Sequence, residues 1–183
     1  MPGLGHNGGP SMQPGVAWRT HCWRAARAQL LPTLPIEVVR LRVKRARDLG
    51  LEYKTYASVR AATGHDLIAF LFSSNALRLL RGRETLPLDR ATKLEAMTCT
   101  RLALAVAPLS PQAVSLNPQI DAAHPAPFAL AKFSEARSAI RAALGKVPGD
   151  RVLLVGDLAL EREWCAAGRL AGYLPAERFF AIP

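Results

Sequence analysis

The stretch DLIAFLF, residues 66–72, is an apolar run of the length of a β-strand, and the polar residues Ser73, Ser74 and Asn75 follow it directly. The same pattern recurs three times, as RLALAVA at 101–107, RVLLV at 151–155 and RFFAI at 178–182. Strands that are apolar along their whole length are buried on both faces, which is typical of a parallel sheet covered by helices. We therefore expect about four strands in a small, mainly parallel sheet.

Helix-like segments separate the last three of these runs. They read FALAKFSEARSAIRAAL at 128–144 and LALEREWCAAGRLAGYL at 158–174. Alternation of strands and helices predicts an α/β fold with helices on both faces of the sheet. Residues 110–127 are rich in Pro, Ser, Asn and Gln, and we expect one long loop there. The sequence thus predicts a small α/β domain over residues 66–183.

The charge of the chain is uneven along its length. The 183 residues carry a formal net charge of +10, and residues 1–90 hold 14 Lys and Arg against 6 Asp and Glu, whereas residues 91–183 hold 10 against 8. Ten of these cations lie between residues 40 and 83. A one-sided positive charge attracts polyanions such as nucleic acid or an acidic membrane surface. The alternative, which stays open, is an Arg-rich surface that is merely solvated.

The basic excess coincides with two expected helices. Pro35 suits the first turn of a helix reading IEVVRLRVKRARDLG, which ends at Gly50, and EYKTYASVRAAT follows as a second helix that ends at Gly64. The first of these helices carries an apolar stripe, and on another face it carries basic residues at intervals of four and three, namely Arg40, Lys44 and Arg47. Residues 16–65 are therefore expected to form a basic helical region.

The spacing of this pair fits a helix-turn-helix. Ala46 is small enough for close packing, Gly50 permits the turn, and Tyr56 is placed to dock the second helix on the first. Arg45 departs from the pattern, because an apolar residue is expected there. In a recognition helix the outward residues that contact phosphates and bases would be Lys54, Thr55, Ser58 and Arg60. A plain helical hairpin with a glycine cap satisfies much of the same pattern.

A second group of polar residues follows the predicted strands. It consists of Ser73, Ser74, Asn75 and Asp157. Ligands of open parallel sheets bind at the carboxyl ends of strands, so these residues are the candidates for a nucleotide or substrate site. Polar residues after strands also serve as helix caps, and Asp157 suits that role. The chain has no GxxxxGK[ST] or GxSxG motif, so the sequence predicts neither a cofactor nor a catalytic residue.

Several further classes are disfavoured by the sequence. Three scattered cysteines without CxxC spacing, and four histidines without an HExxH or HxH pair, argue against a disulfide framework and a metal site. The sequence contains no run of about 18 apolar residues, so it predicts no membrane span. Its start lacks the pattern of a secretory signal. We expect a cytoplasmic protein. The Gly- and Pro-rich residues 1–15 are expected to be a flexible tail.

The start of the chain carries a recognisable signature. Residues 5–10 read GHNGGP, and the segment from Trp18 to Trp23 and the run RARDLGLEYKTY follow. In these features the first 65 residues or so resemble a group of uncharacterised bacterial proteins that open with Gly-His-Asn-Gly-Gly-Pro. The resemblance implies no established activity.

These observations rank three functions. The first is a nucleic-acid-associated, regulatory protein that uses its basic helical region, with the α/β domain as a candidate surface for forming a homodimer. The second is an α/β enzyme or ligand-binding protein with its site at the carboxyl ends of the strands. The third is a structural or adaptor protein without such a site.

Overall fold

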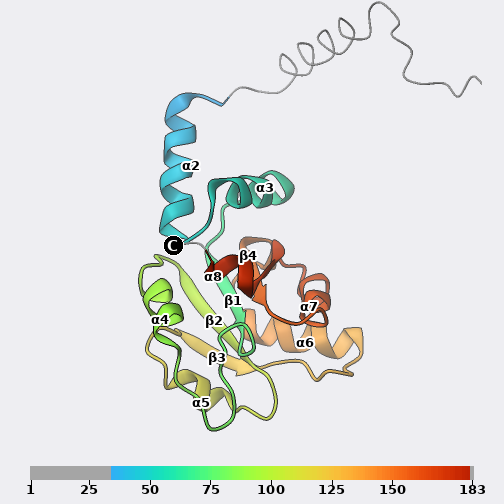
Figure 1. The fold of residues 1–183 in the computed structure, drawn as a ribbon. Coiled ribbons are helices and arrows are strands. Elements are labelled where there is room, and N and C mark those ends of the chain that lie inside the picture. The colour runs from blue at the N-terminus through green and yellow to red at the C-terminus, as the bar shows by residue number, and fades with distance from the viewer. Residues whose placement is uncertain (1–33, 182–183) are drawn as a thin grey trace, which may run out of the picture. The chain divides into compact units, whose positions relative to one another are not determined.

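The computed structural model describes residues 34–181, which contain a five-stranded sheet (Figure 1). The strands are β1 Ala69–Ser73, β2 Thr100–Ala105, β3 Ala122–Pro125, β4 Val152–Gly156 and β5 Gly172–Pro175. Their order across the sheet is β3-β2-β1-β4-β5, and every neighbouring pair is parallel. The α/β class and the parallel sheet predicted from the apolar runs are confirmed.

The helices of the described residues connect and cover these strands. They are α2 Ile36–Asp48, α3 Tyr53–Thr63, α4 Leu88–Glu95, α5 Pro111–Ser115, α6 Phe133–Leu144, α7 Glu161–Gly168 and α8 Ala176–Phe180, with a 3-10 turn, η1, at Gly149–Arg151. Within the described residues, the part of the chain from Arg40 onward forms one compact unit, which contains the sheet. The boundary that the sequence placed after residue 65 stays a prediction.

Two apolar clusters pack against the two faces of the sheet. Because side chains alternate along a strand, Ala69 and Leu71 of β1 point to one face, whereas Phe70 and Phe72 point to the other. Helices α6 and α7 cover the first face through residues such as Ile140, and they lie side by side in Figure 1. The second face is covered by residues of α2, α3, α4, α5 and α8. The result is the three-layer arrangement that the uniformly apolar strands predicted.

The second face is centred on a cluster of aromatic rings. Phe179 of α8 is fully buried, and its ring centroid lies 5.5 Å from that of Phe70 and 5.6 Å from that of Phe72. The neighbouring Phe180 packs edge-on against Phe179 at 4.9 Å. Tilted and edge-on pairs at these separations suit the ring quadrupoles. The short helix α8 is therefore held by its two phenylalanines.

Three of the expected elements were wrong. The run RFFAI at 178–182 was predicted as a strand, but residues 176–180 form α8. The predicted helix 158–174 holds the shorter α7, and β5 begins within its last three residues, whereas β3 lies inside the predicted loop 110–127. Both are edge strands of four residues that are largely half-exposed, so neither has an apolar run to reveal it. A short apolar run such as FFAI does not distinguish a strand from one turn of buried helix.

The turn between α2 and α3 is closed by a Schellman motif. The Leu51 N–H donates to the Ala46 carbonyl at 2.9 Å, and the Gly50 N–H donates to the Arg47 carbonyl at 2.8 Å. Gly50 has a φ of 64°, which a residue without a side chain adopts at little cost. Leu49, Leu51 and Ala46 are all buried below this turn. The predicted pair of helices and its glycine turn are thus present.

Some expectations concern residues that the structure does not describe. The tail at 1–15, the signature at 5–10 and the helix expected from Trp18 to Leu31 all lie outside residues 34–181. Among the residues that are described, no helix has the length and apolar character needed to cross a membrane.

The aromatic cluster yields a test of the fold. We expect Phe179→Ala to lower the free energy of unfolding by about 3–5 kcal/mol, because it leaves a cavity beside Phe70 and Phe72. Phe128, whose side chain is 80% exposed, supplies the control, and Phe128→Ala should change stability by less than about 0.5 kcal/mol. Urea denaturation followed by circular dichroism measures both. Equal effects of the two substitutions would contradict this account of the core.

Candidate functional site

The exposed face of α2 carries three of the predicted basic residues. Arg40, Lys44 and Arg47 are all exposed, and their spacing of four and three residues places them on one side of the helix. Within residues 34–181 none of their side chains forms an ion pair or hydrogen bond. This face therefore offers three positive charges to solvent.

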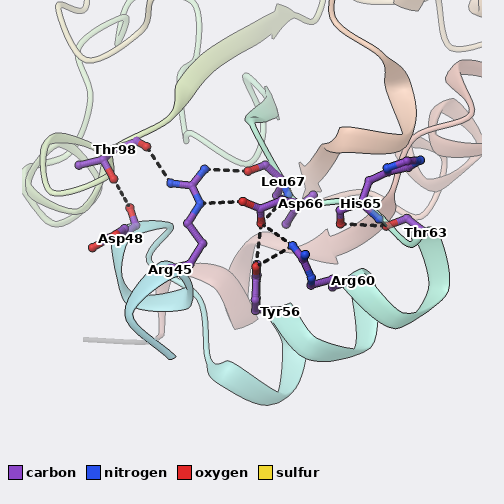
Figure 2. Close-up of polar contacts among 9 residues, drawn as sticks. All are labelled: Arg45, Asp48, Tyr56, Arg60, Thr63, His65, Asp66, Leu67 and Thr98. Carbon is purple, nitrogen blue, oxygen red and sulfur yellow. Dashed lines mark hydrogen bonds and ion pairs between the residues drawn. The ribbon is translucent and has the colours of Figure 1, made fainter. Parts of the chain in front are cut away.

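Arg45 lies on another side of α2 and has a different role. Its Nε donates to Asp66 Oδ2 at 3.1 Å, and its Nη2 donates to the Leu67 carbonyl at 2.8 Å (Figure 2). A third hydrogen bond runs to the Thr98 carbonyl at 3.4 Å. The charge that departs from the helix-turn-helix pattern thus ties α2 to the chain just before β1 and just before β2.

Asp66 also holds α3. The Tyr56 hydroxyl donates to Asp66 Oδ1 at 2.7 Å, and Arg60 Nη1 lies 3.5 Å from the same oxygen (Figure 2). Burial raises the pKa of Tyr56, and the hydrogen bond to the Asp66 carboxylate raises it further. A single carboxylate therefore joins two arginines and a tyrosine from two helices.

The predicted outward face of α3 is only partly outward. Lys54 and Ser58 are exposed, but Thr55 is only 9% exposed and accepts a hydrogen bond from Arg178 Nη2 at 3.2 Å. The prediction that Thr55 points outward was therefore wrong. The physical reason is that Thr55 lies on the side of α3 that faces β5 and α8. Residues of these three elements line a cavity of about 350 Å³ there.

The Arg60 side chain also has partners inside the protein, because it contacts both Asp66 and the Tyr56 hydroxyl. The packing of α2 and α3 through Ala46 and Tyr56 fits a plain hairpin as well as a helix-turn-helix. The recognition-helix assignment of Lys54, Ser58 and Arg60 stays a prediction.

The carboxyl ends of β1 and β4 meet around a buried carboxylate, that of Glu161. Its side chain is 1% exposed and accepts hydrogen bonds from Ser73 Oγ at 2.9 Å and from Asn75 Nδ2 at 2.8 Å. The backbone N–H groups of Asp157 and Leu158 donate to it at 2.6 and 3.2 Å. Four donors from two loops thus satisfy one internal anion.

The strand order explains why these loops meet. The chain leaves β1 toward β2 and β3 and then crosses back to β4 on the other side of β1, so the topological switch point lies between β1 and β4. The predicted residues Ser73, Asn75 and Asp157 are brought together there. Glu161 was missed, because a glutamate in the first turn of a helix is an ordinary feature of a sequence.

The serines at this edge are already engaged. Ser73 and Ser74 are fully buried, and Ser74 Oγ accepts a hydrogen bond from the Val106 N–H at 3.0 Å. Asp157 has an exposed side chain. Gly156 is required by the close packing, because a Cβ there would lie 2.6 Å from Glu161 Oε2. Of the four predicted ligand-binding residues, Asp157 is the one whose side chain is freely accessible.

Arg90 of α4 is a buried cation that the sequence analysis also missed. Its side chain is 4% exposed, donates to the Ala76 carbonyl and stacks 4.2 Å from the ring centroid of Phe180. Burial lowers the pKa of its guanidinium. Its Nε has no hydrogen-bond partner. It holds α4 to the turn after β1, and nothing in its sequence context distinguishes it from the surface arginines.

Residues 34–181 contain no cluster of three or more His, Cys, Asp or Glu side chains suited to a metal ion. No protein-family model matches the chain, and searches of curated proteins and of solved structures found no match.

Replacing Glu161 tests the role of its carboxylate. We expect Glu161→Gln to lower the free energy of unfolding by about 2–4 kcal/mol, because the amide turns a donor toward groups that themselves donate. Glu163 on the exposed side of α7 gives the matched control, Glu163→Gln, with an effect below about 0.5 kcal/mol. Urea denaturation measures the difference, and a Glu161→Gln variant as stable as the parent would refute a structural role for this carboxylate.

A second substitution tests the contacts of Asp66. We expect Asp66→Asn to cost about 1–2 kcal/mol of stability, since it weakens charge-assisted hydrogen bonds to Arg45 and Arg60 at a partly exposed position. Asp89→Asn, at an exposed position of α4, is the control. Thermal unfolding of the two variants is the measurement. If both unfold at the temperature of the parent, Asp66 does not hold the helices in place.

Proposed function

We propose that the protein associates with nucleic acid through the exposed basic face of α2. The observation that carries the proposal is that Arg40, Lys44 and Arg47 are exposed on one side of the helix without a partner among the described residues. The neighbouring Arg45, in contrast, is used for packing. Cations that folding does not use are available for an external anion.

The arrangement suits a chain of phosphates. Arg40 and Arg47 are seven residues apart, so the three charges extend over about 10 Å of helix. Each phosphate that they neutralise releases condensed counterions, and this gives affinity that depends steeply on salt but not on base sequence. The excess of Lys and Arg in residues 1–90 adds attraction at longer range.

The proposal assigns phosphate contacts rather than base contacts to this surface. A recognition helix needs several free polar side chains toward the bases, whereas Thr55 and Arg60 are held by Arg178 and Asp66. Lys54 is exposed and can add a further phosphate contact. The setting that we propose for such binding is a regulatory role in the cytoplasm, with the homodimer as a candidate assembly.

The test is the salt dependence of binding. We expect the variant Arg40→Ala/Lys44→Ala/Arg47→Ala to bind labelled duplex DNA and single-stranded RNA more weakly, with a slope of log K against log salt that is smaller by about 2–3. Fluorescence anisotropy from about 50 to 200 mM salt measures this slope. Each phosphate contact contributes about 0.9 to it for duplex DNA, so the loss counts the contacts.

The matched control removes three exposed cations from the second half of the chain, in Lys132→Ala/Lys146→Ala/Arg162→Ala. It changes the net charge by the same amount and should leave the slope nearly as in the parent. If both variants lose affinity equally, the effect belongs to net charge alone. An unchanged slope in the α2 variant would contradict the proposal.

A second candidate function is ligand binding at the carboxyl edge of the sheet. It is favoured by the switch point between β1 and β4 and by the exposed Asp157 beside it. Here Asp157 would contact the ligand, whereas Glu161 would hold the two loops in place. A ligand found by screening for thermal stabilisation should lose affinity in Asp157→Asn but not in Asp89→Asn. Equal retention in both variants would rule out this site.

A further inference from the structure

A second group of unpaired cations surrounds a cavity at the amino end of β4, at the opposite end of this strand from Asp157. The cavity has a volume of about 460 Å³ and lies between α6 and α7, next to the turn that leads into β4. Three arginines line it, namely Arg137, Arg141 and Arg169, together with a single acidic residue, Asp150. Its volume is in the range of small-ligand sites.

The three guanidinium groups have no partner within the described residues. Arg137 and Arg141 lie one turn apart on the same face of α6, and no ion pair or hydrogen bond engages either side chain. Like charges at this spacing repel each other. Asp150 is itself directed to His65, whose Nε2 lies 3.4 Å from its Oδ2. No ion pair within the described residues therefore joins these arginines to an internal anion.

Arg169 is held in a conformation that is unfavourable for its residue type. It follows α7 directly with a φ of 52°, in the left-handed region where glycine is the usual residue. A non-glycine residue there costs about 1–2 kcal/mol. The unfavourable backbone at Arg169 places a third guanidinium group at the cavity.

The floor of the cavity is formed by closely packed backbone. A Cβ on Gly149 would lie 2.5 Å from the Gly168 carbonyl oxygen, and a Cβ on Gly168 would lie 2.5 Å from Ile140 Cγ2. Glycine at these two positions lets the turn before β4 approach the end of α7, and lets α7 approach α6. The backbone next to the arginines is therefore closely packed and has little room to move.

A plainer role for these arginines is to stabilise helix ends. The carboxyl ends of α6 and α7 both lie at the cavity, and each carries about half a negative charge. Arg141, in the last turn of α6, has this role. Two helix ends and Asp150 together supply about two negative charges against three guanidinium groups. One positive charge is left over, and Arg137 lies two turns before the end of its helix.

We infer that this cavity binds a small phosphate-bearing ligand, such as a phosphomonoester or a pyrophosphate group. Planar guanidinium groups donate paired hydrogen bonds to phosphate oxygens, and three arginines around one cavity can engage an anion with three or more such oxygens. This site is separate from the basic face of α2 and does not depend on nucleic-acid binding.

The test uses inorganic pyrophosphate as the probe for the full-length protein. Isothermal titration calorimetry at fixed ionic strength should give saturable binding in the parent, and affinity at least about tenfold lower in Arg137→Gln/Arg141→Gln. The control Arg81→Gln/Arg83→Gln removes two exposed charges from the segment between β1 and α4 and should bind as the parent does. Binding that does not saturate, or that falls equally in both variants, would overturn the inference.

A further variant separates binding from folding. Arg169→Gly removes a guanidinium but relieves the left-handed backbone, so it should bind pyrophosphate more weakly while unfolding at the same or a higher temperature. Unchanged affinity in this variant would remove Arg169 from the site.

A competition experiment distinguishes the ligand class. If duplex DNA displaces pyrophosphate, and Arg137→Gln/Arg141→Gln lowers the salt slope of DNA binding, the arginines belong to a nucleic-acid surface and the small-ligand inference is wrong. Retention of pyrophosphate binding by the α2 triple variant shows that the two sites are independent.

Discussion

The Asp66 carboxylate is the contact on which the placement of the basic helices depends. It accepts from Arg45 of α2 and from Tyr56 of α3, and its Oδ1 also accepts the N–H of Leu67 just before β1 at 3.0 Å. Several hydrogen bonds to one anion fix the relative orientation of the elements that donate them. Because Arg45 of α2 is turned toward Asp66, the cations that this helix leaves to solvent lie on another side, at Arg40, Lys44 and Arg47.

A similar use of one carboxylate organises the carboxyl edge of the sheet. Glu161 holds the loops after β1 and β4 with donors from both, at the point where open parallel sheets usually receive an external anion or sugar. The protein thus supplies an anion of its own at its switch point. The cations that lack an internal partner lie elsewhere, on α2 and between α6 and α7, and we propose that external anions bind there.

The sequence predicted those parts of the fold that carry an apolar signal. The runs before Ser73, Pro108 and Gly156 were recognised because central parallel strands are buried on both faces. The edge strands β3 and β5 were not, since at least three of the four residues in each are partly or fully exposed. At the candidate sites, the helical spacing predicted that one face of α2 would expose Arg40, Lys44 and Arg47. Pairing of Arg60 with Asp66 and burial of Glu161 depend on tertiary packing, which spacing along the chain does not encode.

The two edges of the sheet share one feature that bears on self-association. Strand β3 ends at Pro125 and β5 ends at Pro175, and each has four residues. Proline has no N–H to donate, and a four-residue edge offers few hydrogen bonds to a strand from another molecule. A second copy therefore has little to gain by extending the sheet into a continuous one. Any dimer of this chain is expected to form through side chains of its helices and loops, and so to be sensitive to single surface substitutions.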